Sequence, residues 1–314
     1  MFTFILRRLV QTLVVLIIVT FIVFLLLYLI PGDPARTMLG IEASAQDVAA
    51  LRSQLGLDRP MMAQYGHWLF HVLQGDLGRS IQFHQPVSHL INTRLPVSIY
   101  IGVLALLLST VLGVGGGIIS AVRRGTLLDQ AITVFANIGV SVPVFWLGIL
   151  GIYVFALRFN LLPVQGFTSP LQDIGSSIQQ IIMPTLCLAM VPLATLARQS
   201  RSAMLEVIQQ DYIRTAWSKG LKERRIILRH ALRNALIPIV TVLGLGVRYV
   251  VSGSVLVETV FNIPGMGRLI VSGVFNKDFI LVQGCVLIVA LVIAITNLVV
   301  DISYAYIDAR VRYE

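Results

Sequence analysis

The sequence predicts an all-α, polytopic membrane protein with six transmembrane helices, and three observations lead to this fold class. Hydrophobic residues make up 56% of the 314 residues and charged residues 12%, with a mean hydropathy of +0.85. Soluble domains carry about 25% charged residues, so most of this chain must face lipid or other apolar surface. Six apolar runs can cross the roughly 30 Å hydrocarbon core at about 1.5 Å per residue, and Lys and Arg gather on one predicted side.

The apolar runs divide the chain into the spans and loops of a single transmembrane domain, residues 1–314. We expect spans at residues 9–30, 97–121, 129–157, 181–197, 235–257 and 280–300. Between them we expect outer loops at 31–95 and 158–180, a cytoplasmic loop at 198–233 and an outer re-entrant segment at 258–279. The first run lacks the short apolar core and the cleavage site of a signal peptide, so we expect it to be retained.

The basic residues set the orientation of these spans. The predicted cytoplasmic pieces hold 15 Lys and Arg in 65 residues, whereas the predicted outer pieces hold 8 in 110. This asymmetry follows the positive-inside rule and places both termini in the cytoplasm, with 31–95 as a large first extracytoplasmic loop. The net charge of +9 does not indicate a nucleic-acid partner, because the basic residues lie beside apolar runs, where they determine topology.

Residues 198–233 form a basic, polar segment between two apolar runs. They carry nine Lys and Arg and three acids. Successive apolar residues in this segment are separated by three to five positions, which is close to helical spacing. Gly220 is a good helix stop, because glycine enters the left-handed conformation without steric cost. We therefore expect two short helices joined at Gly220, the second running from Lys222 to Leu236, and we interpret the pair as a docking element for a soluble partner.

The first outer loop is expected to contain two short helices. Ser44 precedes an Ala- and Leu-rich stretch and is followed three residues later by Asp47, which predicts a capped helix from Ser44 to Leu55. Pro60 then favours the start of a second helix, from Met61 to Leu73.

No pattern of catalytic residues stands out in the sequence. It contains no Gly-x-x-x-x-Gly-Lys-Ser/Thr, Gly-x-Ser-x-Gly or His-Glu-x-x-His pattern. His67 and His71 have the i, i+4 spacing of metal ligands, but no third ligand is in view. Cys187 and Cys285 both lie inside apolar runs, where packing is the expected role. We therefore predict no catalytic residue, no metal site and no cofactor held by this chain.

Three further residues are candidates for a path through the membrane. Pro143 removes a backbone donor within the third span, so we expect a kinked helix that lines the path or serves packing. Arg248 lies deep in the fifth span and must face a cavity, a partner or an interface that its long side chain can reach. Glu258, at the outer end of that span, faces the path or marks the water interface.

The basic segment resembles the cytoplasmic coupling loop of ABC-importer permeases. Its pattern Tyr212-x-x-x-Ala216-x-x-x-Gly220, followed by His-x-Leu-Arg-Asn at 230–234 and by Pro238, is similar to the dipeptide/oligopeptide/nickel branch. Arg214 and Thr215 depart from the Glu-Ala of the general motif. The segments PGDPA at 31–35, SVPVFW at 141–146 and ETVFNIPGMGR at 258–268 also resemble this branch.

The resemblance implies partners and a mechanism. The chain would form half of a translocation path in the bacterial inner membrane, surrounded by lipid. A second homologous permease, two ATP-binding subunits that hold ATP and Mg²⁺, and an extracytoplasmic substrate-binding protein would complete the system. The residues expected to couple this chain to the ATPases are Tyr212, Ala216, Gly220, Leu221, His230, Arg233 and Asn234.

The sequence leaves alternatives open both for the cargo and for the class of protein. Peptides are the first choice of cargo, and nickel or a metal chelate and glutathione remain open within the same family. A stand-alone secondary carrier is a weaker alternative, because it would leave the basic segment without a partner. An intramembrane enzyme would need paired ionisable or nucleophilic residues within the spans, and the sequence offers Arg248 and two isolated cysteines.

Overall fold

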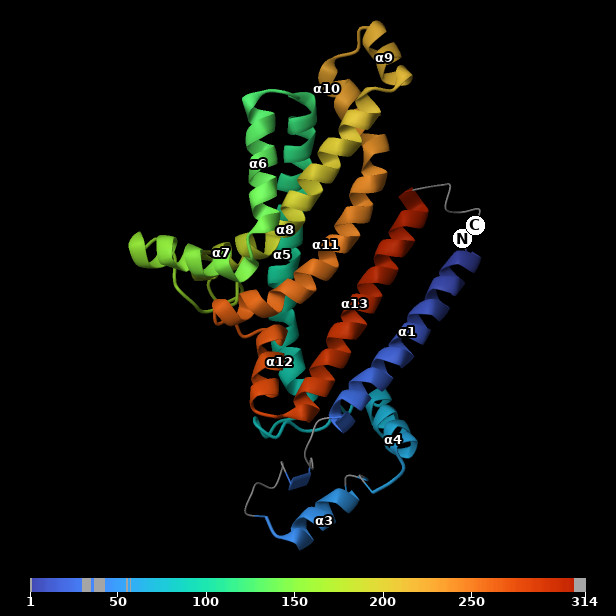
Figure 1. The fold of residues 1–314 in the computed structure, drawn as a ribbon, viewed down its shortest axis with the longest axis vertical. Coiled ribbons are helices and arrows are strands. Elements are labelled where there is room, and N and C mark those ends of the chain that lie inside the picture. The colour runs from blue at the N-terminus through green and yellow to red at the C-terminus, as the bar shows by residue number, and fades with distance from the viewer. Residues whose placement is uncertain (1, 30–34, 37–42, 55, 57, 308–314) are drawn as a thin grey trace. The chain divides into compact units, whose positions relative to one another are not determined.

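The computed structural model describes residues 2–29, 35–36, 43–54, 56 and 58–307. Within these residues the regular structure is helical, apart from one isolated β-bridge between Arg79 and Pro86 (Figure 1). The all-α prediction is therefore confirmed for the described part of the chain. The fold divides into two compact units, which are taken in turn.

The N-terminal unit comprises Leu6–Pro96 and Leu269–Ile295. It holds most of α1 (Phe2–Leu29), α3 (Ala45–Gln54), α4 (Met61–Leu73), the start of α5 (Val87–Val122), and most of α12 (Met266–Phe275) and α13 (Phe279–Ile307). The two helices predicted for the first outer loop are confirmed as α3 and α4. The hydroxyl of Ser44 accepts a hydrogen bond of 3.2 Å from the Asp47 amide, so the predicted cap is present.

Helix α4 packs on α1 through aromatic side chains. The hydroxyls of Tyr65 and Thr20 are hydrogen-bonded at 2.8 Å, and the Tyr65 ring lies 5.5 Å from that of Phe24, with Trp68 beside it. Elsewhere in this unit, buried Asp278 accepts hydrogen bonds from the Ser80 hydroxyl at 2.5 Å and the Gln82 amide at 3.0 Å. These contacts fix parts of the predicted outer loop against α1 and the start of α13.

The central unit comprises residues 2–5, 97–268 and 296–307. Its elements are the rest of α5, α6 (Leu127–Ser141), α7 (Val144–Gly151), the π-helix η1 (Ile152–Arg158), α8 (Ile174–Ile208), α9 (Asp211–Ser218), α10 (Glu223–Arg225), the π-helix η2 (Ile226–Ala231) and α11 (Leu232–Val260). Helix α8 packs against α6, α7 and α11. Its N-cap is Asp173, whose carboxyl pKa is lowered because the Ser176 hydroxyl and nearby amides donate hydrogen bonds to it.

Close packing of α5 on α8 depends on two glycines. A Cβ on Gly113 would lie 2.7 Å from the Leu193 carbonyl oxygen, and a Cβ on Gly117 would lie 2.5 Å from that of Ala197. Both distances are too short for any side chain, so glycine at this i, i+4 spacing lets the two backbones approach.

The third predicted span, residues 129–157, is not one continuous helix. Helices α6 and α7 meet at Ser141–Pro143 with a bend of 105°. Pro143 caps α7 and carries no N–H to continue the ladder, and Val142 before it is extended, at φ −89° and ψ 127°. The expected kink is therefore a break, which makes the segment a broken span or a re-entrant loop.

Five other helices are long and apolar enough to cross a membrane: Leu6–Leu25, Val87–Val122, Ile174–Ile208, Pro238–Val260 and Phe279–Val300. With the bent pair as one span they make six among the described residues. Several helices run past the predicted span limits: α5 begins ten residues before position 97, and α8 continues through 198–208. Hydropathy marks the apolar part of a helix, whereas capping and turn residues fix its ends. The segment 258–279 contains the end of α11, a turn and α12.

Candidate functional site

Helix α9 is a short helix whose inner face belongs to the hydrophobic core of the central unit. Ile213 is fully buried and Ala216 is 7% exposed. They pack in one apolar cluster with residues of α5, α8, η2 and α11, which include Met204, Ile226 and Ile239. Burial of this face packs α9 against the long helices, so α9 shares its apolar contacts with α8 and α11.

The end of α9 is a Schellman cap built from three of the predicted residues. Gly220 has φ +71°, its amide donates to the Trp217 carbonyl at 2.9 Å, and the Leu221 amide donates to the Ala216 carbonyl at 3.4 Å. Leu221 also packs against the apolar cluster, as the motif favours. The predicted break at Gly220 is confirmed. The helical path then resumes at α10 and continues through η2 into α11.

The structure brings two more predicted residues together. The Asn234 side-chain amide donates to the Tyr212 hydroxyl at 2.6 Å, which ties the start of α11 to α9. His230 is half-buried within η2, and Arg233 is exposed at the start of α11. The seven residues thus have different places: Ala216, Gly220 and Leu221 shape the cap, Tyr212 and Asn234 pin it, His230 is half-buried in η2, and Arg233 faces outward.

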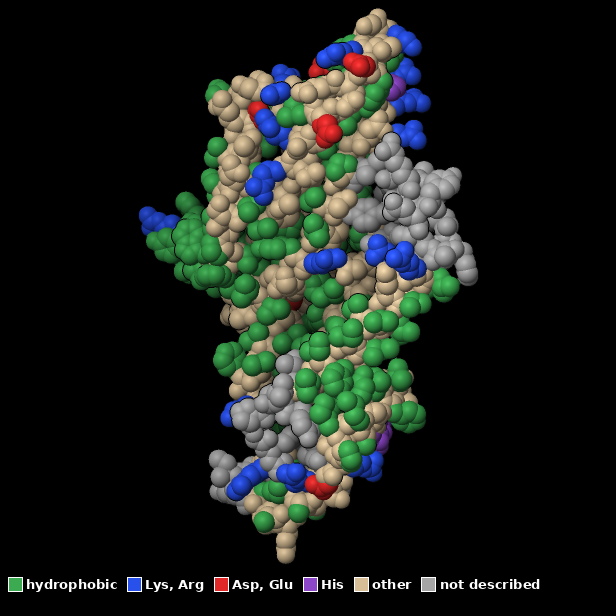
Figure 2. All heavy atoms as spheres, turned by 45° about the vertical axis from the view of Figure 1, so that its right-hand side comes forward, with side chains coloured by type: hydrophobic (Ala, Val, Ile, Leu, Met, Phe, Trp, Pro, Cys, Tyr) green, Lys and Arg blue, Asp and Glu red, His purple; other side chains and the backbone are tan. Residues whose placement is uncertain are grey.

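The outer face of α9 is polar and basic with one large aromatic residue. The exposed residues of α9 and its C-cap are Asp211, Tyr212, Arg214, Thr215, Trp217, Ser218 and Lys219. The Asp211 carboxylate lies 3.4 Å from Arg214 Nη1. Trp217 is 48% exposed and was not singled out from the sequence; it follows buried Ile213 by four residues and so lies at the edge of the buried face of α9. Figure 2 shows basic side chains gathered around α9 and α10. An exposed tryptophan amid cations is a typical anchor for a protein partner.

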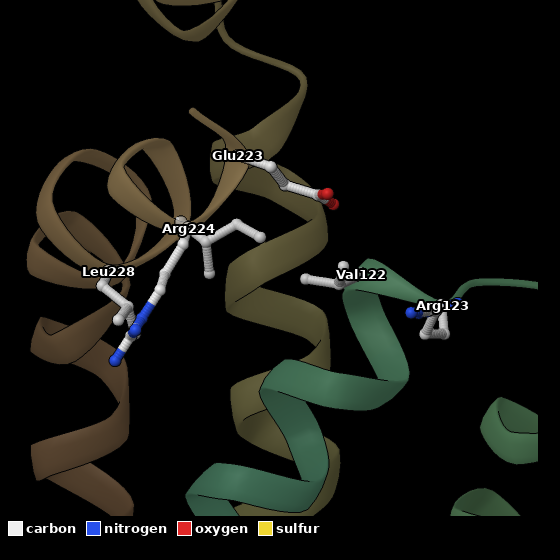
Figure 3. A pocket seen from close by; sticks show the side chains of 6 residues that line it. Val122, Arg123, Glu223, Arg224 and Leu228 are labelled. Atoms are coloured by element: carbon white, nitrogen blue, oxygen red, sulfur yellow. The ribbon is translucent and has the colours of Figure 1, made fainter. Parts of the chain in front are cut away.

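A pocket of about 540 Å³ lies at the same end of the unit. Val122 and Arg123, at the end of α5, lie across it from Glu223, Arg224 and Leu228 (Figure 3).

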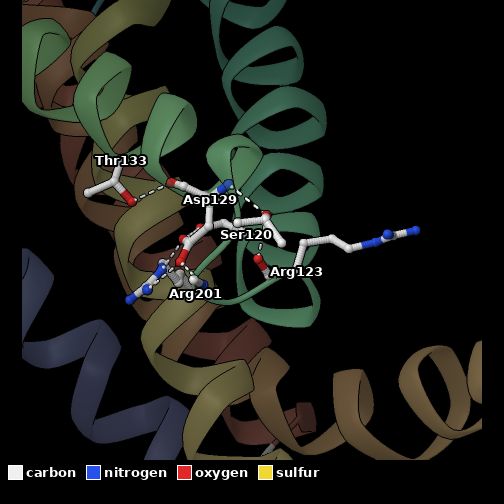
Figure 4. A network of polar contacts seen from close by, with 7 residues as sticks. Ser120, Arg123, Asp129, Thr133 and Arg201 are labelled. Atoms are coloured by element: carbon white, nitrogen blue, oxygen red, sulfur yellow. Dashed lines mark hydrogen bonds and ion pairs between the residues drawn. The ribbon is translucent and has the colours of Figure 1, made fainter.

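A buried ion pair fixes the α5–α6 turn to α8 at this end. The Asp129 carboxylate is 6% exposed and accepts hydrogen bonds from Arg201 Nε at 2.8 Å and Nη2 at 3.0 Å (Figure 4). The Ser120 hydroxyl and the Gly125 amide also donate to it. Arg201 is therefore a structural residue, although its sequence position had suggested one more basic side chain of the docking segment.

The structure corrects the prediction for Glu258. Its side chain is 1% exposed, and it accepts hydrogen bonds from the Ser98 hydroxyl at 2.6 Å and the Arg268 amide at 3.0 Å. A Cβ on Gly265 would collide with the Glu258 carboxyl carbon, and a Cβ on Gly267 would collide with the Val255 Cα, so these glycines allow the turn to close on this end of α11. Glu258 thus holds the turn between α11 and α12 and does not present its carboxylate to a path or to water. The sequence could not show that Glu258 is buried, because the groups that donate hydrogen bonds to it lie on α5 and beyond the turn after α11.

The other two path candidates lie on exposed surface. Pro143 is exposed at the break between α6 and α7. Arg248 is exposed on α11, and its Nε donates to the Asn297 side-chain oxygen of α13 at 3.0 Å. Asn297, a polar residue inside the last span, was not singled out from the sequence.

Among the described residues, no group of three His, Cys, Asp or Glu side chains could hold a metal ion. His67 and His71 do face each other, with their Nε2 atoms 3.3 Å apart on the exposed side of α4. Cys187 and Cys285 are both buried and unpaired.

Together these features define a class of protein: a helical, multi-pass membrane protein whose central unit carries a capped, partly exposed short helix, α9, with basic residues around it. The chain belongs to the family of binding-protein-dependent transport system inner membrane components, whose model matches residues 113–313. A second model, for the N-terminal part of such membrane components, matches residues 1–102. The chain is accordingly a multi-pass protein of the bacterial inner membrane and an ABC transporter permease.

Similar proteins cover almost the whole chain. A protein of Sinorhizobium fredii named a probable peptide ABC transporter permease is 43% identical over 99% of both chains. The dipeptide transport system permease proteins DppB of Escherichia coli and of Alkalihalophilus pseudofirmus are each 37% identical over 100% of both chains.

Proposed function

We propose that this chain forms half of the translocation path of an ATP-driven importer that carries peptides. The observation that supports peptide cargo is full-length similarity to permeases named for peptides and dipeptides. In this proposal the chain is non-catalytic and holds no cofactor. ATP and Mg²⁺ bind to two partner ATPases, a second homologous permease completes the path, and an extracytoplasmic binding protein delivers the cargo.

The proposed contact with an ATPase is the outer face of α9. Trp217 and the cations around it would enter a groove of the ATPase, while the capped end at Gly220 fixes their direction. Closure of the ATPase dimer on ATP would move α9. Because α9 shares one apolar cluster with α8 and α11, those helices would move with it. ATP binding to the partner subunits would thus shift α8 and α11 between two arrangements in the membrane.

This proposal places the basic end of the central unit in the cytoplasm. The α5–α6 turn, α9, α10 and η2 would lie there, while α3, α4 and the turn between α11 and α12 would lie outside. The support is the positive-inside distribution, with 15 Lys and Arg in the 65 residues of the assigned cytoplasmic pieces. The single transmembrane domain, residues 1–314, then carries six spans, with α6, α7 and η1 counted as the third.

The proposal is tested by uptake into cells that lack this chain. Deletion should abolish ATP-dependent uptake of labelled di- or oligopeptides, and the intact chain should restore it. Competition separates the alternatives: unlabelled peptides should compete, whereas nickel, metal chelates and glutathione should not. Unchanged peptide uptake in the deletion strain, or uptake that persists after ATP depletion, would contradict the proposal and favour another cargo or a secondary carrier.

A further inference from the structure

The exposed side of α11 differs from that of an ordinary lipid-facing helix. On α1, the exposed residues of the middle stretch are all aliphatic: Leu13, Val14, Val15, Ile17, Ile18 and Ile22. On α11, the exposed positions recur every three or four residues and are mostly polar: Thr241, Leu245, Arg248, Ser252, Leu256 and Thr259. The hydroxyls of Ser252 and Thr259 donate to the Tyr249 and Val255 carbonyls of their own helix. The group of this stripe that is costly against lipid is therefore the Arg248 guanidinium, which suits a surface that contains water.

Arg248 lies near the middle of its span. It follows Pro238 by ten residues and precedes Val260 by twelve. At about 1.5 Å per residue, both ends of the span are about 15–18 Å away along the helix. An arginine side chain is too short to bring its guanidinium to either interface from that depth, so snorkelling does not account for this residue.

Within the described part of the chain, the guanidinium of Arg248 is held in place by a neutral partner. Its Nε donates to Asn297, a neutral partner. The described residues provide no carboxylate for its Nη groups, since the buried acids Asp129 and Glu258 are engaged with other donors. A guanidinium is always charged, and its planar fork matches the two oxygens of a carboxylate. Among the described side chains, this oriented cation near the middle of its span has no carboxylate partner, so it suits the anionic group of a passing molecule.

We propose that Arg248, oriented by Asn297, is a carboxylate-binding station halfway along the path, where it pairs briefly with the C-terminal carboxylate of the passing peptide. This inference rests on the proposed function. Exposed Thr241 precedes Arg248 along α11, and exposed Ser252 and Thr259 follow it, so the cargo meets polar side chains before and after the station. Binding must be weak enough for release, as in any conducting path.

The test uses chemical rescue at position 248 in the complete transporter, purified with its native partners and reconstituted with its binding protein. Arg248→Cys should lower ATP-dependent uptake of a dipeptide with a free C-terminus by about tenfold, the scale of one lost charge-assisted interaction. The cationic reagent trimethylammonioethyl methanethiosulfonate should restore much of this uptake, whereas the anionic sulfonatoethyl reagent should not. Cys187 and Cys285 are buried, at 7% and 0% exposed, so they provide little background reaction.

Controls separate the station from other roles. Arg158→Gln removes an exposed positive charge at the end of η1 and should leave uptake unchanged. Failure of Arg248→Cys to assemble with its partner subunits, no labelling by either water-soluble reagent, normal uptake before labelling, or equal rescue by both reagents would each overturn the inference. Absence of ATP-dependent dipeptide uptake by the unaltered transporter would instead refute the proposed function.

Discussion

Replacement of Gly220 by valine is expected to leave the chain in the membrane but to lower coupled uptake by about tenfold. Gly220 has φ +71°, where a residue with a Cβ is strained by roughly 1–2 kcal/mol and a β-branched residue by more. A Cβ there meets nothing within 4 Å in this chain, so the effect arises from the backbone or from a partner. ATP-dependent uptake and ATPase stimulation in proteoliposomes measure the coupling.

Gly220→Asn tells the two causes apart, because asparagine tolerates the left-handed conformation. Uptake by the asparagine variant should recover if backbone strain dominates, and should stay low if the partner groove admits no side chain.

The chain offers a matched control in Gly75, which closes the same kind of cap after α4. It has φ +84°, its amide donates to the Val72 carbonyl, and the Asp76 amide donates to the His71 carbonyl. A Cβ on Gly75 also meets nothing within 4 Å. Gly75→Val therefore introduces the same strain away from α9, and uptake should stay close to that of the unaltered chain. An equal loss in the two valine variants would show a general effect on folding.

Arg201→Ala is expected to cause the largest loss of stability. It leaves the Asp129 carboxylate buried without its cation, which costs about 3 kcal/mol, at the low end for buried pairs because Arg201 is 32% exposed. The melting temperature of the purified chain should fall by roughly 6–12 °C if unfolding resembles that of a domain of 150–250 residues. Arg198→Ala, an exposed cation one turn earlier on α8, should have little effect.

A double-mutant cycle identifies the pair itself. Asp129→Asn removes the buried charge, so adding Arg201→Ala to that variant should cost much less than it does in the unaltered chain. Equal costs of Arg201→Ala in both backgrounds, or a cost no larger than that of Arg198→Ala, would contradict a structural role for the pair.

The features that the sequence predicts well depend on neighbouring residues. The Ser44 cap, the start of α4 after Pro60 and the break at Gly220 are each determined within four or five positions. The features that the sequence did not predict depend on residues that are far apart along the chain. Asp129 and Arg201 are 72 residues apart, and Ser98 and Glu258 are 160 apart, so no local sequence pattern could show that these side chains pair.

The break at Pro143 lies between these cases. The proline predicts an interruption, but its 105° angle depends on how α7 packs against α8 and α11. Sequence patterns carry no such angle, and the same proline would be compatible with a mild kink.

The most direct test of the account is photo-crosslinking from α9 in native membranes. A photoreactive amino acid in place of Trp217 should crosslink to an ATP-binding subunit, and the yield should change between ATP and ADP. The same amino acid in place of Phe70, which is 59% exposed on α4, should give no such product, because α4 is assigned to the opposite side of the membrane. Crosslinks from position 217 to lipid or to the binding protein, or an ATPase product from position 70 instead, would contradict the assignment of α9 as the coupling helix.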